Sequence, residues 1–483
     1  MKSKLLVLVV LISMLVALAG PANVQAAAYG LTFTTSITYQ NVTDAATTVN
    51  FIFYPGGIGT GIPIDRPDLP GMAASSLFVG SLGDIDPGFQ GSAVLMTTQQ
   101  VAATLVQLPP SGSTVKVRPL SNGFVEGSDY VLVPTILKAT FNKHSLWSVQ
   151  NVDDVAADLT VTFKPVGGTP FDVEVNDLPA GAARFFDMAT APEITTPTFN
   201  GSVTIQAYEA GTTNPGSVVA TSVELGITND EAYAFEGFTT GSNTVYMPSA
   251  FCNWGPTDKV RSAFAVQNTE PTGGPDAVVT VTYSNGNADT PVTIHPGERA
   301  SFSGCGQSGS LNPTDFLGSA IITSVGGKIV AMGKVGGDGG YSTAYSGFSQ
   351  GYSEVAMPYV RWSQTQYLTG VRQQVNIAIQ NVGTAPIPAG GITISYYDVN
   401  GDLVGTDSNP SEIAVGGKYS SNANKIPGGA GAEFGYAVPG VIGGGAIVSA
   451  TGAELAVMGR VCTYNTALAV AACEDYNGNP VTP

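Results

Sequence analysis

Apolar and polar residues alternate in short runs along most of the chain. Between residues 129 and 243, seven such runs are separated by Gly, Pro, Asn and Asp: 131–137, 145–150, 158–164, 171–175, 182–186, 202–208 and 218–225. Alternation with a period of two, bounded by turn residues, predicts strands with one buried face. No run has a convincing helical period. Seven short strands in about 110 residues predict an immunoglobulin-like antiparallel sandwich.

The alternating pattern recurs four times. A Gln-Asn pair ends one apolar strand in each unit, and a second period-two run follows each pair. The asparagines of these pairs are Asn41, Asn151, Asn268 and Asn381. Repetition at a fixed period is typical of stacked modules. We expect each asparagine side chain to hydrogen-bond the turn that follows it, although a site shared by all modules would show the same recurrence.

A second motif marks the ends of the first three units. The stretches GFVEG, GFTTG and GFSQG place Phe124, Phe238 and Phe348 after a glycine, and a proline follows eleven residues after that glycine. The third stretch fits the glycine-x-serine-x-glycine elbow of serine hydrolases. Val125 and Thr239 occupy the position of Ser349 in the other copies, so we interpret the motif as structural, with the phenylalanine plugging a seam between modules.

These repeats predict an all-β protein, a tandem array of four immunoglobulin-like antiparallel β-sandwich modules. The expected divisions are a signal peptide at 1–26 and modules at 27–128, 129–243, 244–354 and 355–483, the last with a C-terminal tail. The VQN strand end, the VTVTY or ITISYY strand and the later Pro-Gly turn resemble bacterial cell-adhesion-related immunoglobulin-like repeat proteins. That resemblance implies a stalk, adhesion or scaffold role and assigns no functional residues.

The first 26 residues carry two lysines, an apolar run and small residues before Ala27, which is typical of a secretory signal peptide. We therefore expect a secreted or cell-surface protein with no membrane insertion after cleavage. The formal net charge is −17, which disfavours nucleic acid as a partner. Four cysteines in an exported chain predict disulfides, and we favour pairing within modules: Cys252 with Cys305 and Cys462 with Cys473.

Candidate ligand sites are few. Asp398, Asn400 and Asp402 in DVNGD offer oxygens to calcium, but Asn400-Gly401 is also a common two-residue hairpin turn. Trp254 and Trp362 lie in polar inserts and are the candidates for stacking on sugars. His144 and His295 fall at non-equivalent positions of different modules, so no histidine-based catalytic group is indicated.

We therefore expect a non-enzymatic, structural or adhesive surface protein without a cofactor, calcium excepted. We picture it as a rod of modules. Its last module ends in a linker segment with no module after it, which suggests head-to-tail assembly into fibres. The partners would then be further copies of the chain, or a surface polysaccharide or protein. The alternative is a glycan-binding array that uses the two tryptophans.

Overall fold

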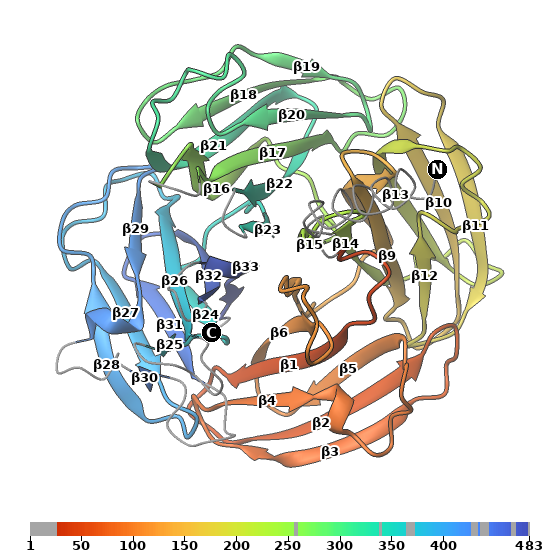
Figure 1. The fold of residues 1–483 in the computed structure, drawn as a ribbon, viewed down its shortest axis with the longest axis horizontal. Helices are drawn as coiled ribbons and strands as arrows, with labels where there is room; N and C mark the ends of the chain where they lie inside the picture. Colours follow the sequence, from red (N-terminus) through yellow and green to blue (C-terminus); the bar gives the residue numbers. More distant parts are fainter. Residues whose placement is uncertain are drawn as a thin grey trace, which may run out of the picture.

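A computed structural model describes residues 27–255, 259–337, 341–363, 372–426, 433–434, 444–464 and 470–481. The expected signal peptide at 1–26 lies outside these residues. The described chain is built of antiparallel strands and contains no α-helix. Four sandwich modules follow one another around a ring (Figure 1). The prediction of an all-β tandem array of antiparallel modules is confirmed.

The second module contains all seven predicted strands and one that the pattern did not predict. The seven are β8 (Tyr130–Lys138), β9 (Lys143–Asn151), β10 (Ala157–Pro165), β11 (Phe171–Leu178), β12 (Ala183–Asp187), β13 (Phe199–Glu209) and β14 (Val218–Gly226). The eighth is β15 (Ala232–Glu236), immediately before the GFTTG motif.

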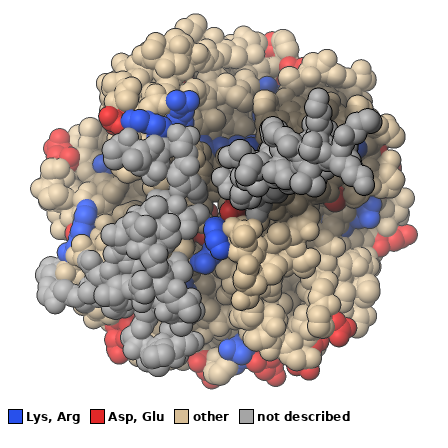
Figure 2. All heavy atoms as spheres, viewed as in Figure 1, with Lys and Arg blue, Asp and Glu red and all other residues tan. Residues whose placement is uncertain are grey.

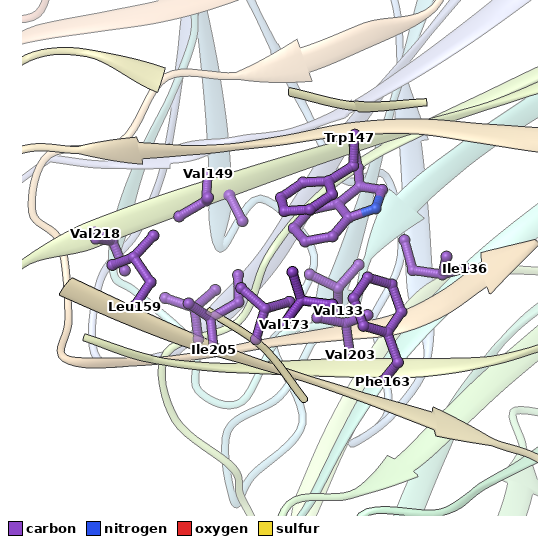
Figure 3. Close-up of a cluster of buried hydrophobic side chains, with 14 of the residues drawn as sticks. Val133, Ile136, Trp147, Val149, Leu159, Phe163, Val173, Val203, Ile205 and Val218 are labelled. Carbon is purple, nitrogen blue, oxygen red and sulfur yellow. The ribbon is translucent and has the colours of Figure 1, made fainter. Parts of the chain in front are cut away.

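The two sheets of this module have the orders β11-β10-β13-β8 and β12-β9-β14-β15. Their inward residues form one apolar core, in which Trp147 stacks on Phe186 and meets Phe163 edge-on (Figure 3). In an antibody constant domain the first strand pairs with the second and the seventh with the sixth. Here the first strand pairs with the sixth and the seventh with the second, so these two strands have exchanged sheets.

The third module repeats the same order of eight strands. These are β16 (Thr244–Cys252), β17 (Arg261–Asn268), β18 (Ala277–Tyr283), β19 (Val292–Ile294), β20 (Arg299–Ser303), β21 (Phe316–Gly326), β22 (Ile329–Gly336) and β23 (Ser342–Ser346). The proline of its first strand, Pro248, lies at a β-bulge between Met247 and Ala250. The strand is at the edge of its sheet, where a missing N–H is tolerated.

The fourth module adds short strands to this plan. Its strands are β24 (Glu354–Met357), β25 (Trp362–Ser363), β26 (Arg372–Asn381), β27 (Ile392–Tyr397), β28 (Leu403–Ser408), β29 (Lys418–Ser421), β30 (Glu433–Phe434), β31 (Gly445–Ala450), β32 (Leu455–Tyr464), β33 (Val470–Asn477) and β34 (Asn479–Pro480). A 3₁₀ turn, η2, covers Ala423–Lys425.

The first module has seven strands. They are β1 (Thr34–Asn41), β2 (Thr47–Pro55), β3 (Ile62–Leu69), β4 (Ala74–Phe78), β5 (Gly91–Thr97), β6 (Val101–Leu108) and β7 (Leu120–Asn122), with a 3₁₀ turn, η1, at Val79–Ser81. Their sheets are β4-β1-β6-β7 and β3-β2-β5. Aligned with the other modules, they correspond to strands two to eight. The first described residues, Ala28 and Tyr29, instead hydrogen-bond Asn229 and Gly226 of the second module.

Equivalent joints connect successive modules. One turn residue with positive φ recurs in every module, namely Met72, Gly181, Gly297 and Gly416. Its carbonyl oxygen accepts a hydrogen bond from the glutamine of the same module's Gln-Asn pair. In three joints it also accepts one from a serine of the preceding module, at 2.7 Å from Ser92, 3.0 Å from Ser202 and 2.6 Å from Ser319. In these three joints, the turn that the glutamine binds is therefore also the contact with the preceding module.

The fourth joint connects the last module to the first. Gly445 replaces the serine, and a Cβ there would lie 2.3 Å from Oε1 of Gln40. Gln100 donates to the Pro480 carbonyl at 2.9 Å, and Val42 and Ala102 pack with Ala356 and Ile447. The ring is thus closed by contacts within one chain.

The expectation of an extended rod is therefore wrong. The sequence left two possibilities for the segment after Val461: folding back under a Cys462–Cys473 bridge, or docking on the first module of another copy. The first is found, because β33 pairs with β32 and the bridge is formed. Asn477 and Pro480 then contact the first module of the same chain. The C-terminal segment of the same chain therefore occupies the surface of the first module on which a segment from another copy would dock. The reason given for a head-to-tail fibre does not hold.

Closure can be tested at Gly401, in the hairpin between β27 and β28. A Cβ at Gly401 would lie 2.0 Å from the Gly71 carbonyl oxygen of the first module. Gly286 has a similar φ, +87° against +89°, but has nothing within 4 Å of such a Cβ. We expect Gly401→Ala to loosen the ring and to raise the radius of gyration in small-angle X-ray scattering. Gly286→Ala, which carries the same backbone cost, should leave the radius unchanged. Equal radii for both variants would argue against the joint.

Candidate functional site

Two features stand out beyond the repeated sandwich: a polar hub inside the ring and an open edge on the first module. The hub consists of the eighth strands β7, β15, β23 and β33, which lie toward the centre of the ring (β15, β23 and β33 are labelled in Figure 1). On the face shown in Figure 2, acidic side chains lie mostly near the rim and most of the described surface is uncharged.

Hydrogen bonds connect the four hub strands in a closed circuit. Glu236 accepts from the Asn122 backbone N–H at 2.5 Å and from the Ser346 hydroxyl at 2.8 Å. The Asn477 side chain donates to the Ser346 carbonyl, and the Asn122 side chain donates to the Asn477 carbonyl, both at 2.7 Å. These four residues each precede the glycine that begins the junction after their strand. The circuit therefore uses one equivalent position in every module.

Burial also shifts the pKa values of carboxyl groups at the hub. It raises the pKa of Glu236, although the two donors lower it in part. Burial raises the pKa of Glu474 to about 8, against a partial offset from Arg118 of the first module. Among the described residues, none forms a hydrogen bond with either carboxylate oxygen of Glu474. Burial thus disfavours the charged form of both carboxyl groups.

Two buried ion pairs lie at joints outside this circuit. Lys334 contacts both carboxylate oxygens of Glu224 at 2.6 and 2.7 Å, and Thr135 donates to the same carboxylate. Arg460 contacts Asp475 at 2.7 and 2.8 Å. The first pair connects the second and third modules. Removal of one partner would leave an uncompensated buried charge, which costs about 3–5 kcal/mol.

The open edge follows from the missing first strand of the first module. In the second module β8 fills the space between β13 and the residues after β15, where Leu132 and Phe238 exchange backbone hydrogen bonds of 2.7 and 2.8 Å. In the first module, the corresponding space lies between β5 and Phe124. Among the described residues, no strand pairs with β5 on that side.

The missing strand leaves a groove, an open cavity of about 1830 Å³ at the joint of the first and second modules. Its lining includes Ala93 and Leu95 of β5, Ala103 of β6, and Phe124. Ala93, Leu95 and Ala103 are partly exposed, whereas their counterparts in the second module are buried: Val203 (0%), Ile205 (0%) and Ala220 (1%). The groove therefore exposes apolar core surface. In each of the other modules, that module's own first strand covers the equivalent surface.

The tryptophans proposed for sugar stacking are partly buried. The ring of Trp254 lies 5.6 Å from that of Phe251, and Trp254 packs against the core of the third module. Trp362 packs against the core of the fourth module, and its indole nitrogen is buried with no hydrogen-bond partner in the described part of the chain. Trp147 is 2% exposed. The structure does not bring Trp254 and Trp362 together in one site, since their rings belong to different cores.

The calcium candidate forms a hairpin turn whose acidic side chain is already engaged. Asp398 accepts hydrogen bonds from the backbone N–H groups of Asn400 and Asp402, at 2.8 and 3.0 Å. Gly401 donates to the Asp398 carbonyl, so Val399 and Asn400 are the central residues and Gly401 has the positive φ. The expected two-residue Asn-Gly turn is wrong by one residue. Within the described part of the chain, no three His, Cys, Asp or Glu side chains gather as a metal site.

The four cysteines form the two favoured bridges, Cys252–Cys305 and Cys462–Cys473. The side chains of Asn41, Asn151, Asn268 and Asn381 each accept from the backbone N–H two residues later and donate to carbonyls of the surrounding turns. These asparagines thus close the turns that follow them.

The phenylalanines of the glycine-phenylalanine motif differ between modules. Phe238 and Phe348 are fixed by backbone hydrogen bonds to the first strand of their own module. Phe124 has no such strand beside it and lines the groove. Ser349 is exposed in the bend after Phe348.

Sequence reasoning missed the eighth strands and therefore the hub. A signal existed in the polar residue before each junction glycine, Asn122, Glu236, Ser346 and Asn477. The last of these was not recognised because asparagine replaces phenylalanine after its glycine.

Comparisons with known proteins add little. No protein-family profile matches the sequence, and no curated protein matches it. The chain is similar to a solved structure described as a tetra-tandem repeat in the extending region of a large adhesion protein, with 11% identity, a TM-score of 0.11 and coverage of 92% of this chain and 93% of the other. A similarity of this size carries no argument about function.

The hub circuit can be tested at Glu236. Glu236→Ala leaves the Asn122 N–H and the Ser346 hydroxyl buried without their acceptor, so we expect the free energy of unfolding to fall by about 1–3 kcal/mol. Glu412→Ala removes an exposed glutamate and serves as the control. Urea denaturation measures both variants, and equal midpoints would contradict the circuit's contribution.

The buried carboxyl group of Glu474 predicts a pH dependence. Because its pKa is raised from 4.5 to about 8, its contribution to stability is present below pH 4.5 and is lost as the pH rises through about 8. We expect Glu474→Gln to have a higher Tm than the unchanged protein at alkaline pH and a similar Tm at acidic pH. Differential scanning calorimetry across this range checks the sign. A constant difference at every pH would show that Glu474 does not titrate in this window.

Proposed function

We propose that this chain is an exported, non-enzymatic scaffold with a structural or adhesive role at the cell surface or in the extracellular matrix. The observation that carries the proposal is closure: serine contacts at three equivalent joints, and a different set of contacts between the last module and the first, form a ring within one chain. A closed ring holds the outer surfaces of its four modules in fixed positions relative to one another. Its recurrent polar residues are engaged in turns and joints.

The leader pattern of the sequence and the two disulfides support an extracellular location. Disulfides persist in oxidising compartments and are rare in the cytosol. No helix in the described part of the chain is long and apolar enough to cross a membrane.

Electron microscopy combined with cell fractionation tests this proposal. Residues 27–483, purified without reductant, should appear in negative stain as discrete four-lobed rings of one chain each. In the producing cell, antibody labelling should place the protein on the surface or in the surrounding matrix. Rods or filaments of open chains would overturn the scaffold, and an intracellular location would overturn the surface role.

A further inference from the structure

We propose that the groove of the first module accepts an extended peptide strand donated by another protein. The inference begins from the comparison between modules. Three of the four modules fill the same place with their own first strand, β8, β16 or β24, paired antiparallel to the sixth strand. In the first module the sixth strand, β5, presents that edge unpaired among the described residues.

The edge of β5 lacks the usual protection against strand addition. Exposed edges are commonly blocked by charged residues or proline. The sequence of β5, GSAVLMT, has neither, and Met96 within it is 44% exposed. The second side of the groove, at Phe124, also lacks the partner that Phe238 and Phe348 have. A strand entering the groove would therefore find backbone partners on both sides.

The groove also continues an established interface. In the second module, β8 covers its own core and also contacts β17 and β22 of the third module. The groove of the first module lies at the equivalent joint, and its lining includes Arg184 and Phe185 of the second module. A donated strand would thus be held between two modules, as β8 is.

The three filled copies define the chemistry of the donor. Each places apolar side chains in the core at positions one, three and six, with proline at position four: Val131, Val133 and Ile136; Val245, Met247 and Ala250; Val355, Met357 and Val360. The donor is therefore an uncharged extended segment with two branched or methionine side chains two residues apart, then proline, then another apolar residue.

Charge at one end of the groove adds a further requirement. Lys138 follows β8's core residues and donates to the Ile194 carbonyl at 2.7 Å. The corresponding loop of the first module places Asp84 and Asp86 on either side of buried Ile85, and both acids are exposed. A lysine or arginine at the C-terminal flank of the donor would be attracted to these carboxylates.

A peptide from the chain itself provides the probe. Residues 128–140, SDYVLVPTILKAT, contain the first strand of the second module. We expect this peptide, fluorescently labelled, to bind residues 27–483 in an anisotropy titration. A control peptide carrying Val131→Asp and Val133→Asp should bind at least about tenfold more weakly, because it would bury two carboxylates in the apolar groove. Ala103→Phe in the protein should fill the groove and also weaken binding, at an unchanged Tm.

Hydrogen exchange identifies the site of binding. Strand β5 pairs with β2 on its other side, so only alternate amides of 91–97 point into the groove. These amides should exchange rapidly in the free monomer and about tenfold or more slowly with the peptide. Absence of binding, or equal binding of the control peptide, would overturn the proposal. Protection of 91–97 without peptide at low concentration would mean that the chain covers its own groove. Protection that appears only with dimer formation would assign the groove to a second copy instead. The assay uses only the purified chain, so its failure would leave the surface scaffold untouched.

Discussion

Closure of the ring is the constraint on which the rest of the structure depends. Each module places an eighth strand inside the ring, and each such strand is covered by its two neighbours. Backbone and side-chain polar groups on these strands are out of water and must find partners within the chain. The circuit through Asn122, Glu236, Ser346 and Asn477 provides them. An open rod would leave the first and last of these groups exposed to solvent and would lose the circuit.

The joints explain why so few polar positions recur. A single turn carbonyl oxygen accepts hydrogen bonds from the glutamine of its own module and from the serine of the preceding module. One turn therefore determines both the local fold and the position of the neighbouring module. Glycine at this turn supplies the positive φ in three modules, and Met72 adopts it in the first. At the closing joint Gly445 replaces serine because the Gln40 side chain occupies the space of a Cβ. The last joint is thus equivalent in position but different in contacts.

The first module is the exception to the repeat. Modules two to four receive their first strand from the chain that leaves the previous module, and this strand completes the core. The described N-terminal residues of the first module instead pack on the second module. Val101 and Ala103 are therefore partly exposed, although Leu455 and Val457 at the same positions of the fourth module are 0% exposed. Within the residues that the structure describes, the core of the first module is incomplete and gives the ring an apolar surface.

The sequence by itself determined the first seven strands of the repeat, its recurrence and the disulfides, because these depend on local alternation, on turn residues and on cysteines within one repeat. All seven runs predicted in the second module are strands, and both favoured cysteine pairs are formed. Only the tertiary structure decided that the array is a ring and that, among the described residues, β5 has a strand partner on one side only. Strand β15 and the serines of the joints act through residues more than 85 positions away, as Ser92 does with Gly181 at a separation of 89. The packing of whole modules brings such partners together, and the local alternation of apolar and polar residues does not encode that packing.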